Sequence, residues 1–249
     1  MSILELPQHE LVRLREKAKE ITGSRFDYES VYSELLTRRL NGEPLQYIEE
    51  YIPFYSIQIN VDSRCLIPRP ETEYLIEIIK NTIVNPNKIL DVGTGTGCIA
   101  LMLKKIFPNS KVEGIDISSS AIELSKENSI LNNLNVEFYT SNLLDSVESN
   151  DFDVIVANLP YIPTENLQTL DKEVLDYEPL IALDGGTDGL YYIKNLISQI
   201  EERDMKNLTL FLEVDVSHVN ILINEFSSWS TVKLEKDLVE RDRFIIARK

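Results

Sequence analysis

The segment Lys88–Gly97, KILDVGTGTG, constrains the fold of this chain more than any other segment. A short apolar run centred on Leu90 stops at glycines in alternate positions, and an apolar-periodic stretch follows. This order is typical of a buried strand, a tight turn and the start of a helix. Glycines carry no Cβ, so a ligand can lie against the main chain and the free N–H groups of the helix N-terminus. We therefore predict a cofactor-binding turn made of Gly93, Thr94, Gly95, Thr96 and Gly97.

Two carboxylates near this turn narrow the choice of cofactor. The glycine spacing is GxGxG, whereas the common dinucleotide fingerprint is GxGxxG, which argues against a nicotinamide cofactor. Asp91 precedes the turn and suits an ammonium group rather than a pyrophosphate. Asp116 ends the next apolar strand, where a carboxylate can accept hydrogen bonds from two ribose hydroxyls. A ribose and an ammonium group without phosphate indicate S-adenosylmethionine, which leaves as S-adenosylhomocysteine after methyl transfer.

Two further segments are expected at the edges of this cofactor site. Ser141-Asn142-Leu143 follows the third predicted strand, where Asn142 can meet the edge of the adenine ring and Leu143 its face. The segment Ile67–Glu73, IPRPETE, is stiffened by two prolines and leads into a helix just before the cofactor unit. From this second segment, the side chains expected to line the edge of the cavity are those of Arg69, Glu71 and Thr72.

Strand and helix signals alternate through the rest of the chain as in a doubly wound sheet. Strands are predicted at 88–92, 111–116, 135–139, 152–157 and 207–215, and helices at 97–107, 119–131, 188–203 and 217–227. Two final strands, at 231–237 and 242–248, have no helix between them and must form an antiparallel hairpin on the sheet edge. The predicted fold is α/β, with a Rossmann-like seven-stranded sheet of the class I S-adenosylmethionine-dependent methyltransferase type.

The N-terminal part of the chain has a different pattern and predicts two smaller units. Residues 1–45 contain two apolar stripes at helical spacing and predict a small helical domain, which either packs on the rest of the chain or presents a face to a partner. Apolar and polar residues then alternate, which predicts a β-hairpin linker over 46–66, bent at Pro53. The catalytic domain covers 67–249.

Composition argues against several other functions. The 249 residues include 41 acidic and 25 basic ones, giving a net charge of −16, and such a surface repels phosphate backbones, so direct nucleic-acid binding is not expected. The two cysteines and two histidines are scattered, which predicts no metal site, and Cys98 is expected to be a buried packing residue. There is no apolar run of about 18 residues and no signal-peptide pattern at Met1–Glu10, so we expect a cytoplasmic protein without membrane association.

The segment Asn158-Leu159-Pro160-Tyr161 follows an apolar strand and is the predicted site of chemistry. Ligands of open α/β sheets bind at the carboxyl ends of strands, which is where this segment lies. The Asn158 side chain offers one acceptor oxygen, Pro160 directs the preceding carbonyl of Leu159, and the Tyr161 ring offers a flat face. These groups suit a planar acceptor that carries an NH2, and we predict that all four residues bind the substrate.

An amide or aromatic amine is a poor nucleophile because its lone pair is delocalised into the adjacent π system. Two hydrogen bonds accepted from the NH2 favour the pyramidal nitrogen of the transition state and aim its lone pair at a sulfonium methyl group. No strong general base is needed, since the extra proton becomes acidic only as the N–C bond forms. We predict that Asn158 and Tyr161 are catalytic, and that Asn158 also contacts the cofactor.

At these residues the chain resembles the peptide chain release factor glutamine methyltransferases of the HemK/PrmC type. The similar segments cover most of residues 42–248. They are GEPLQYI at 42–48, IPRPETE at 67–73, GTGTG at 93–97, NLPYIP at 158–163, YEPLIALDGGTDGL at 177–190, KD at 236–237 and RDR at 241–243. IPRPETE together with EPLIALDGG is specific to this family, whereas adenine-N6 methyltransferases share the Asn-x-Pro-Tyr element.

The resemblance implies methylation of the side-chain amide nitrogen (N5) of the glutamine in the GGQ motif of class 1 peptide chain release factors. Asn158 and the Leu159 carbonyl would hold that amide, Tyr161 would pack against it, and the N-terminal helical domain of a monomeric enzyme would contact the release factor. Leu159 stands where the family usually has proline, which keeps the carbonyl but loses one fixed φ angle. Asn142 stands where the family often has aspartate.

Three other functions are compatible with parts of this pattern. An adenine-N6 methyltransferase of RNA or DNA would share NLPY, but the net charge of −16 and the lack of a Lys/Arg cluster argue against it. A ribosomal-protein glutamine methyltransferase would use the same chemistry, although the PETE segment at 70–73 resembles the release factor branch. A binding module that has lost turnover would not need the complete set of predicted site residues.

Overall fold

The computed structural model describes residues 6–23 and 27–249; residues 1–5 and 24–26, which belong to the predicted N-terminal domain, lie outside the described residues. The helices are α1 Gln8–Thr22, α2 Tyr28–Leu40, α3 Leu45–Glu49, α4 Pro70–Thr82, α5 Cys98–Ile106, α6 Ser119–Asn132, η2 Thr164–Thr169, α7 Lys172–Tyr177, η3 Leu180–Ala182, α8 Tyr191–Glu202, η4 Val216–His218 and α9 Val219–Glu225. The strands are β1 Tyr51–Phe54, β2 Ile57–Asn60, β3 Lys88–Val92, β4 Lys111–Asp116, β5 Glu137–Thr140, β6 Val154–Ala157, β7 Thr209–Glu213, β8 Thr231–Lys236 and β9 Asp242–Arg248.

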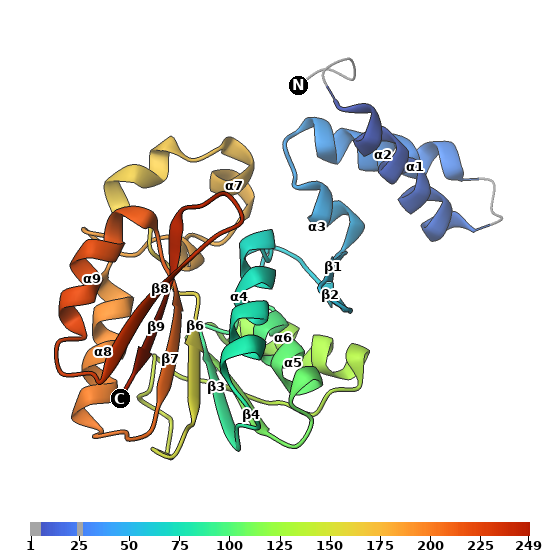
Figure 1. Cartoon of the computed structure of the whole chain (residues 1–249). Helices are drawn as coiled ribbons and strands as arrows, with labels where there is room; N and C mark the ends of the chain where they lie inside the picture. The colour runs from blue at the N-terminus through green and yellow to red at the C-terminus, as the bar shows by residue number, and fades with distance from the viewer. Residues whose placement is uncertain (1–5, 24–26) are drawn as a thin grey trace.

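The catalytic part is built on a seven-stranded sheet with the order β5-β4-β3-β6-β7-β9-β8 (Figure 1). Strands β3 to β7 run parallel to one another, whereas β9 is antiparallel to both β7 and β8. The predicted seven-stranded α/β sheet with an antiparallel C-terminal hairpin is therefore confirmed. The chain builds outward from β3 to β5 and then returns to place β6 on the other side of β3. This reversal between β3 and β6 is the topological switch point, where open α/β sheets bind their ligands.

Alternate residues of the central strands enter two separate apolar cores, one on each face of the sheet. On β3, Ile89 joins the core beneath α4, α5 and α6, whereas Leu90 and Val92 join the core beneath α8 and α9. Figure 1 shows these two groups of helices on opposite sides of the sheet. Successive side chains of a strand point to opposite faces, so a strand buried on both sides is mostly apolar.

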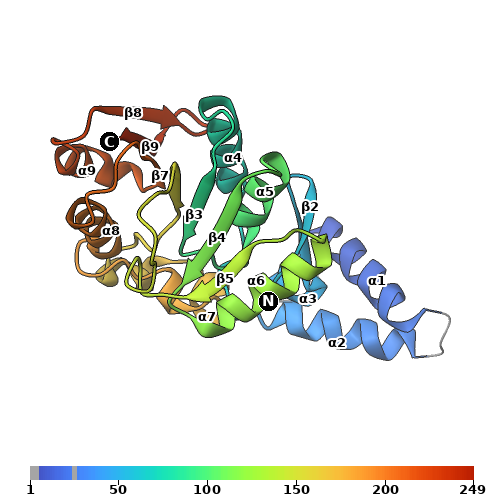
Figure 2. The same ribbon diagram turned by 90° about the horizontal axis from the view of Figure 1, so that it is seen from below.

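The N-terminal helices α1 and α2 form a small unit that extends away from the sheet (Figure 2). Among its described residues, the buried core consists of Leu14, Ala18, Leu35, Leu45 and Ile48. Polar contacts join it to the catalytic part. The buried guanidinium of Arg39 donates to Glu10 of α1 at 2.6 Å and to Glu173 of α7 at 2.7 Å. The Tyr177 hydroxyl donates to the Asn41 carbonyl at 3.1 Å.

The linker differs from the prediction in its first half. Residues Leu45–Glu49 form α3, although their alternating pattern predicted a strand. Pro44 precedes the helix, and its carbonyl accepts the N–H groups of Tyr47 and Ile48. The side chains of Leu45, Tyr47 and Ile48 are all buried, a spacing that a half-buried strand cannot provide. The hairpin is β1 and β2, and Pro53 pairs with Gln58 inside it, so the predicted bend at Pro53 is wrong.

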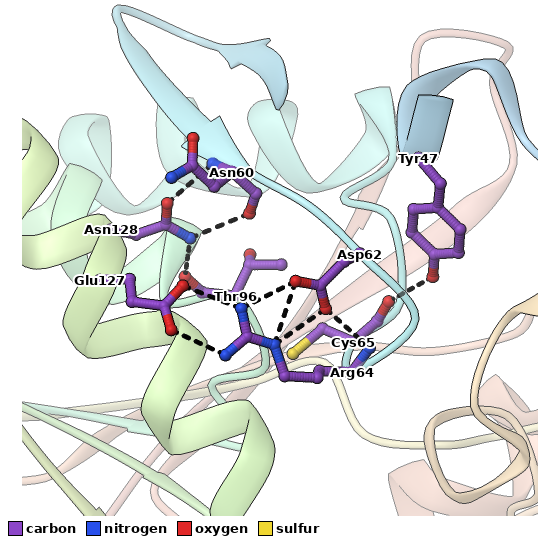
Figure 3. Close-up of polar contacts among 8 residues, drawn as sticks. All are labelled: Tyr47, Asn60, Asp62, Arg64, Cys65, Thr96, Glu127 and Asn128. Atoms are coloured by element: carbon purple, nitrogen blue, oxygen red, sulfur yellow. Dashed lines mark hydrogen bonds and ion pairs between the residues drawn. The ribbon is translucent and has the colours of Figure 1, made fainter. Parts of the chain in front are cut away.

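Polar contacts fix the linker onto α6 of the catalytic part, as Figure 3 shows. The fully buried Asn128 side chain accepts from the Asn60 N–H at 2.7 Å and donates to the Asn60 carbonyl at 3.1 Å. It also donates to the Thr96 carbonyl in the glycine turn at 2.9 Å. Nearby, Arg64 bridges Asp62 and Glu127 at 2.7 and 2.8 Å. A single α6 side chain therefore connects the linker with the predicted cofactor turn.

The segment between β6 and α8 contains η2, α7 and η3, which the sequence pattern did not predict. Neither α7 nor η3 has a buried residue, so their sequences lack the apolar periodicity by which helices are recognised. A bridge between Ile162 and Asp184 closes this segment. It lies beside the carboxyl end of β6, where the predicted acceptor residues are found. Among the described residues, no helix combines the length and apolar character that crossing a bilayer requires.

Candidate active site

A cavity of about 990 Å³, including its open mouth, lies at the carboxyl ends of β3, β4 and β6. Ten of the thirteen predicted site residues line the cavity, namely Gly93, Thr94, Gly95, Thr96, Asp116, Asn142, Leu143, Asn158, Leu159 and Pro160. The other three, Asp91, Gly97 and Tyr161, lie behind it.

The glycine turn adopts a backbone conformation that other residues avoid. Gly93, Gly95 and Gly97 have φ angles of 73°, 53° and 81°, in the left-handed region that favours glycine. A Cβ on Gly93 would lie 2.9 Å from Cδ2 of Leu159, so the glycine also permits close approach of the acceptor segment. Gly97 is the N-cap of α5, and the first N–H groups of that helix point towards the cavity end of the turn.

Asp116 ends β4 and faces the cavity. Its two carboxylate oxygens accept the N–H groups of Gly95 and Ser118, each at 2.9 Å. Burial raises the pKa of this carboxyl, while the N–H donors of Ser118 and Gly95 act in the opposite direction. Each oxygen keeps a lone pair for a further donor. This geometry is suited to the two hydroxyls of a ribose, and ribose binding by Asp116 stays a prediction.

Asp91 occupies a different position from Asp116. It is fully buried, and its Oδ2 accepts from the Thr94 hydroxyl at 2.6 Å and from the Ala100 N–H at 3.2 Å. Its Oδ1 has no hydrogen-bond partner among residues 6–23 and 27–249. Burial raises the pKa of Asp91 to about 7. The structure shows Asp91 holding the glycine turn to α5, and contact with a cofactor ammonium group stays a prediction.

The predicted adenine end of the cavity is held by a tight loop after β5. Leu143 has a φ of 47°, and its carbonyl accepts from the Ser141 hydroxyl at 2.6 Å. Asn142 donates to Asp145 at 3.0 Å. Ile117 also lines the cavity and is 45% exposed, although the sequence analysis did not single it out. Its position one residue after Asp116 was the sequence feature that could have indicated a place in the site.

The acceptor segment lies directly after β6 with its side chains in different environments. Asn158 faces the cavity, and its Nδ2 donates to the Thr72 hydroxyl at 3.3 Å. Leu159 is buried against the core beneath α8. Tyr161 lies behind the cavity, with its hydroxyl 3.5 Å from Nη1 of Arg243. Burial raises the pKa of Tyr161, so its hydroxyl is neutral at pH 7.

The structure adds residues that come from distant parts of the chain. Arg69 and Thr72 line the cavity, as expected for the IPRPETE segment, but Glu71 does not. Pro179, Ile181 and Ala182 of the segment before α8 complete the wall. Glu213, at the end of β7, lies just behind the wall and accepts from Thr72 at 3.1 Å. The contributions of Pro179, Ile181, Ala182 and Glu213 could not be inferred from local pattern because each depends on the packing of separate elements.

The two cysteines also lie at this cavity. Cys98 is buried in the first turn of α5, which confirms the predicted packing role. Burial raises the pKa of its thiol to about 12, so the thiolate is scarce at neutral pH. Cys65 lines the cavity as well, and burial raises the pKa of its thiol further. Neither thiol is activated as a nucleophile.

The cavity fits S-adenosylmethionine in its donor set. The three glycines of the turn carry no Cβ and leave room for the ligand beside the main chain. The Asp116 carboxylate can meet hydroxyl donors, and Ile117 and Leu143 offer apolar faces to a ring. Within residues 6–23 and 27–249, no group of three or more His, Cys, Asp or Glu side chains is placed to hold a metal ion.

Comparison with known proteins agrees with this geometry. Residues 70–175 match the family model described as methyltransferase small domain. A solved methyltransferase structure from Pyrococcus furiosus superposes with a TM-score of 0.59 and 23% identity, covering 86% of this chain and 97% of that one. The fold is therefore that of the class I methyltransferases.

The sequence relatives are more specific. A release factor glutamine methyltransferase from Thermodesulfovibrio yellowstonii is 39% identical over 225 residues, which are 86% of this chain and 80% of the relative. One from Koribacter versatilis is 36% identical over 234 residues, or 93% of this chain and 82% of the relative. The chain belongs to the release factor glutamine methyltransferase family, which confirms the resemblance noted in its motifs.

Proposed function

We propose that this protein transfers the methyl group of S-adenosylmethionine to the side-chain amide nitrogen (N5) of the glutamine in the GGQ motif of class 1 peptide chain release factors. Family membership over 86–93% of the chain supports the reaction. The observation that carries the site assignment is the orientation of Asn158. Its amide nitrogen is engaged by Thr72, which leaves its oxygen as the acceptor at the cavity.

The residues of the chain have two tasks in this reaction. Asn158 Oδ1 and the Leu159 carbonyl accept the two hydrogens of the substrate amide and favour its pyramidal form. The neutral Tyr161 supports the planar group from behind. When bound, the cofactor supplies a methyl carbon activated by a sulfonium. The substrate nitrogen, held by the two acceptors, would take that methyl group with loss of S-adenosylhomocysteine and would release one proton to solvent.

The binding roles assigned to other residues follow the shape of the cavity. Asp116 binds the ribose, the glycine turn lies along the cofactor, and Asn142 and Leu143 contact the adenine. The N-terminal helices, which extend from the sheet in Figure 2, contact the release factor. A monomeric state, a cytoplasmic location and the lack of a metal or of direct nucleic-acid binding complete the proposal.

Transfer of label from S-adenosylmethionine tests this function. The purified protein is incubated with a class 1 release factor, with a variant of that factor in which the GGQ glutamine is replaced by alanine, and with total RNA. We expect label on the release factor, none on its variant and none on RNA. Label on RNA with an unlabelled release factor would favour the alternative function, an adenine-N6 methyltransferase acting on RNA or DNA.

A further inference from the structure

Three polar side chains from distant parts of the chain form a continuous hydrogen-bonded row behind the acceptor site. Asn158 Nδ2 donates to Thr72 Oγ1 at 3.3 Å, and Thr72 Oγ1 donates to Glu213 Oε2 at 3.1 Å. Thr72 and Glu213 are each only 2% exposed. Asn158 and Thr72 line the cavity, whereas Glu213 does not. The row therefore runs from the cavity wall into the interior.

The sheet register places the two ends of this row side by side. Ala157 on β6 pairs with Leu212 on the parallel strand β7, so Asn158 and Glu213 are the next residues on adjacent strands. Thr72 lies in the first turn of α4, which packs across these strand ends. A buried carboxylate needs hydrogen-bond donors, and Thr72 supplies one.

The number of protons in this row decides which way the Asn158 amide points. Thr72 has a single hydroxyl proton, and an ionised Glu213 can only accept, so that proton points to Glu213. The Thr72 oxygen can then only accept from Asn158, which must present its NH2 group to it. The Asn158 oxygen is consequently left free on the cavity side. In the flipped amide, an NH2 group would face the NH2 of the substrate, and the hydrogen bond would be lost.

We propose that Thr72 and Glu213 are positioning residues that select the rotamer of Asn158 in which Oδ1 faces the methyl-accepting nitrogen. This inference rests on the proposed function, because it concerns the same amide acceptor. Neither residue touches the reacting atoms in this role. Each acts by removing the alternative in which Asn158 offers a donor where an acceptor is required.

Protonation of Glu213 would reverse the donor and acceptor roles along these hydrogen bonds. A protonated Glu213 can donate to Thr72, whose own proton then turns towards Asn158 and favours the flipped amide. Burial raises the pKa of Glu213 to about 7; Glu71 of α4 raises it further, while Thr72, Arg243 of β9 and Asn158 lower it. The remaining titratable neighbours, Tyr161 and Cys98, are neutral at pH 7. Transfer should therefore decline as the pH falls below about 7.

Two substitutions of Thr72 separate the hydroxyl from the packing volume. Thr72→Val keeps the shape and removes the hydroxyl, whereas Thr72→Ser keeps the hydroxyl. We expect Thr72→Val to lower kcat about 10- to 100-fold, the range expected when a reacting group is misplaced by up to about 1 Å. Thr72→Ser should restore kcat to within about threefold of the wild type. Cofactor affinity measured by calorimetry should stay within about threefold in both variants.

Glu213→Gln tests the pH dependence of kcat, which would not change if Glu213 had a purely structural role. The glutamine retains an acceptor oxygen but does not titrate in this range, so the decline of kcat between about pH 8 and pH 6 seen in the wild type should be absent. An unchanged pH profile in Glu213→Gln, or equal kcat values in Thr72→Val and Thr72→Ser, would overturn the inference. Wild-type methylation of the release factor is measured in parallel. If it succeeds, those results refute the positioning role alone; if it fails, the proposed function and this inference fall together.

Discussion

The two ends of the cavity are constructed in different ways. The cofactor end is a main-chain structure, in which the φ angles of Gly93, Gly95 and Gly97 form the turn and the Asp116 carboxylate secures it through N–H groups. The acceptor end depends on side chains, because the Asn158 amide is oriented through Thr72 from another element. A main-chain site is set once the strand and helix form, whereas a side-chain site needs correct packing between elements. Substitutions at the two ends should consequently affect different steps.

The largest effect is expected at the acceptor end. Asn158→Ala removes the acceptor oxygen that favours the pyramidal amide nitrogen, and we expect transfer to fall by about 100-fold or more, as for the loss of one preorganised hydrogen-bonding group. Single-turnover kinetics with a release factor measure this loss. Cofactor affinity measured by calorimetry is the control and should change little. Unchanged turnover would show that transfer does not depend on the Asn158 side-chain oxygen, and the contrast between the two ends would be lost.

A smaller effect is expected at the cofactor end, and it concerns cofactor affinity rather than the rate of transfer. Asp116→Ala removes a charged acceptor for ribose hydroxyls, a type of hydrogen bond worth about 1.5–3 kcal/mol, so Kd for S-adenosylmethionine should rise about 10- to 100-fold. Asp116→Asn, which keeps one acceptor oxygen, is the matched control and should lose less. The rate at saturating cofactor should stay close to that of the wild type. Calorimetry that finds equal affinities in all three proteins would refute the ribose assignment.

The buried carboxyl behind the turn should affect stability rather than binding. Asp91 has a pKa of about 7 in the folded protein and an ordinary value of 3.8, so the folded state holds a proton that the unfolded state releases between these pH values. Stability should therefore fall as the pH rises from about 4 to about 7, with a limiting slope of about 1.4 kcal/mol per pH unit for one proton. Urea unfolding at several pH values measures the slope.

Asp91→Asn tests the origin of that pH dependence. The variant should show a shallower fall of unfolding free energy between pH 5 and pH 7, since one titrating group has been removed. A residual slope is expected from Glu213, whose pKa burial raises to about 7 from 4.5. If the slopes of the variant and the wild type coincide, Asp91 does not carry a proton in the folded protein at these pH values.

The smallest effect is expected in the linker, where Arg64 lies at the rim of the cavity. Arg64 bridges Asp62 and Glu127 at the surface, and all three side chains are at least a quarter exposed. Exposed ion pairs contribute roughly 0–1 kcal/mol, so Arg64→Ala should lower the unfolding free energy by less than about 1 kcal/mol. Urea unfolding in low and high salt measures this loss. A loss of several kcal/mol would mean that the surface bridge, and not the buried Asn128, holds the linker.

Local pattern predicted the cofactor end well and the linker poorly. The turn at 93–97 could be inferred because glycine spacing and the flanking apolar runs are both local features. Residues 45–49 form α3 because Leu45 and Ile48 pack against α1 and α2. The strand prediction is wrong here because Tyr47 and Ile48 are consecutive apolar residues, so the alternation does not extend through this segment. The helices between β6 and α8 were missed because they bury almost nothing.

The sequence by itself determined the strands of the seven-stranded sheet, the helices α4, α5, α6, α8 and α9, the glycine turn, the position of Asn158 after an apolar strand and the family resemblance. These depend on residues that are close together in the chain. Only the tertiary structure decided that Asp91 lies behind the turn instead of in the cavity, and that Thr72 and Glu213 meet Asn158. Thr72 and Glu213 are separated from Asn158 by 86 and 55 residues respectively. The register of β6 on β7 and the packing of α4 across their ends bring these side chains together, and no local pattern encodes either.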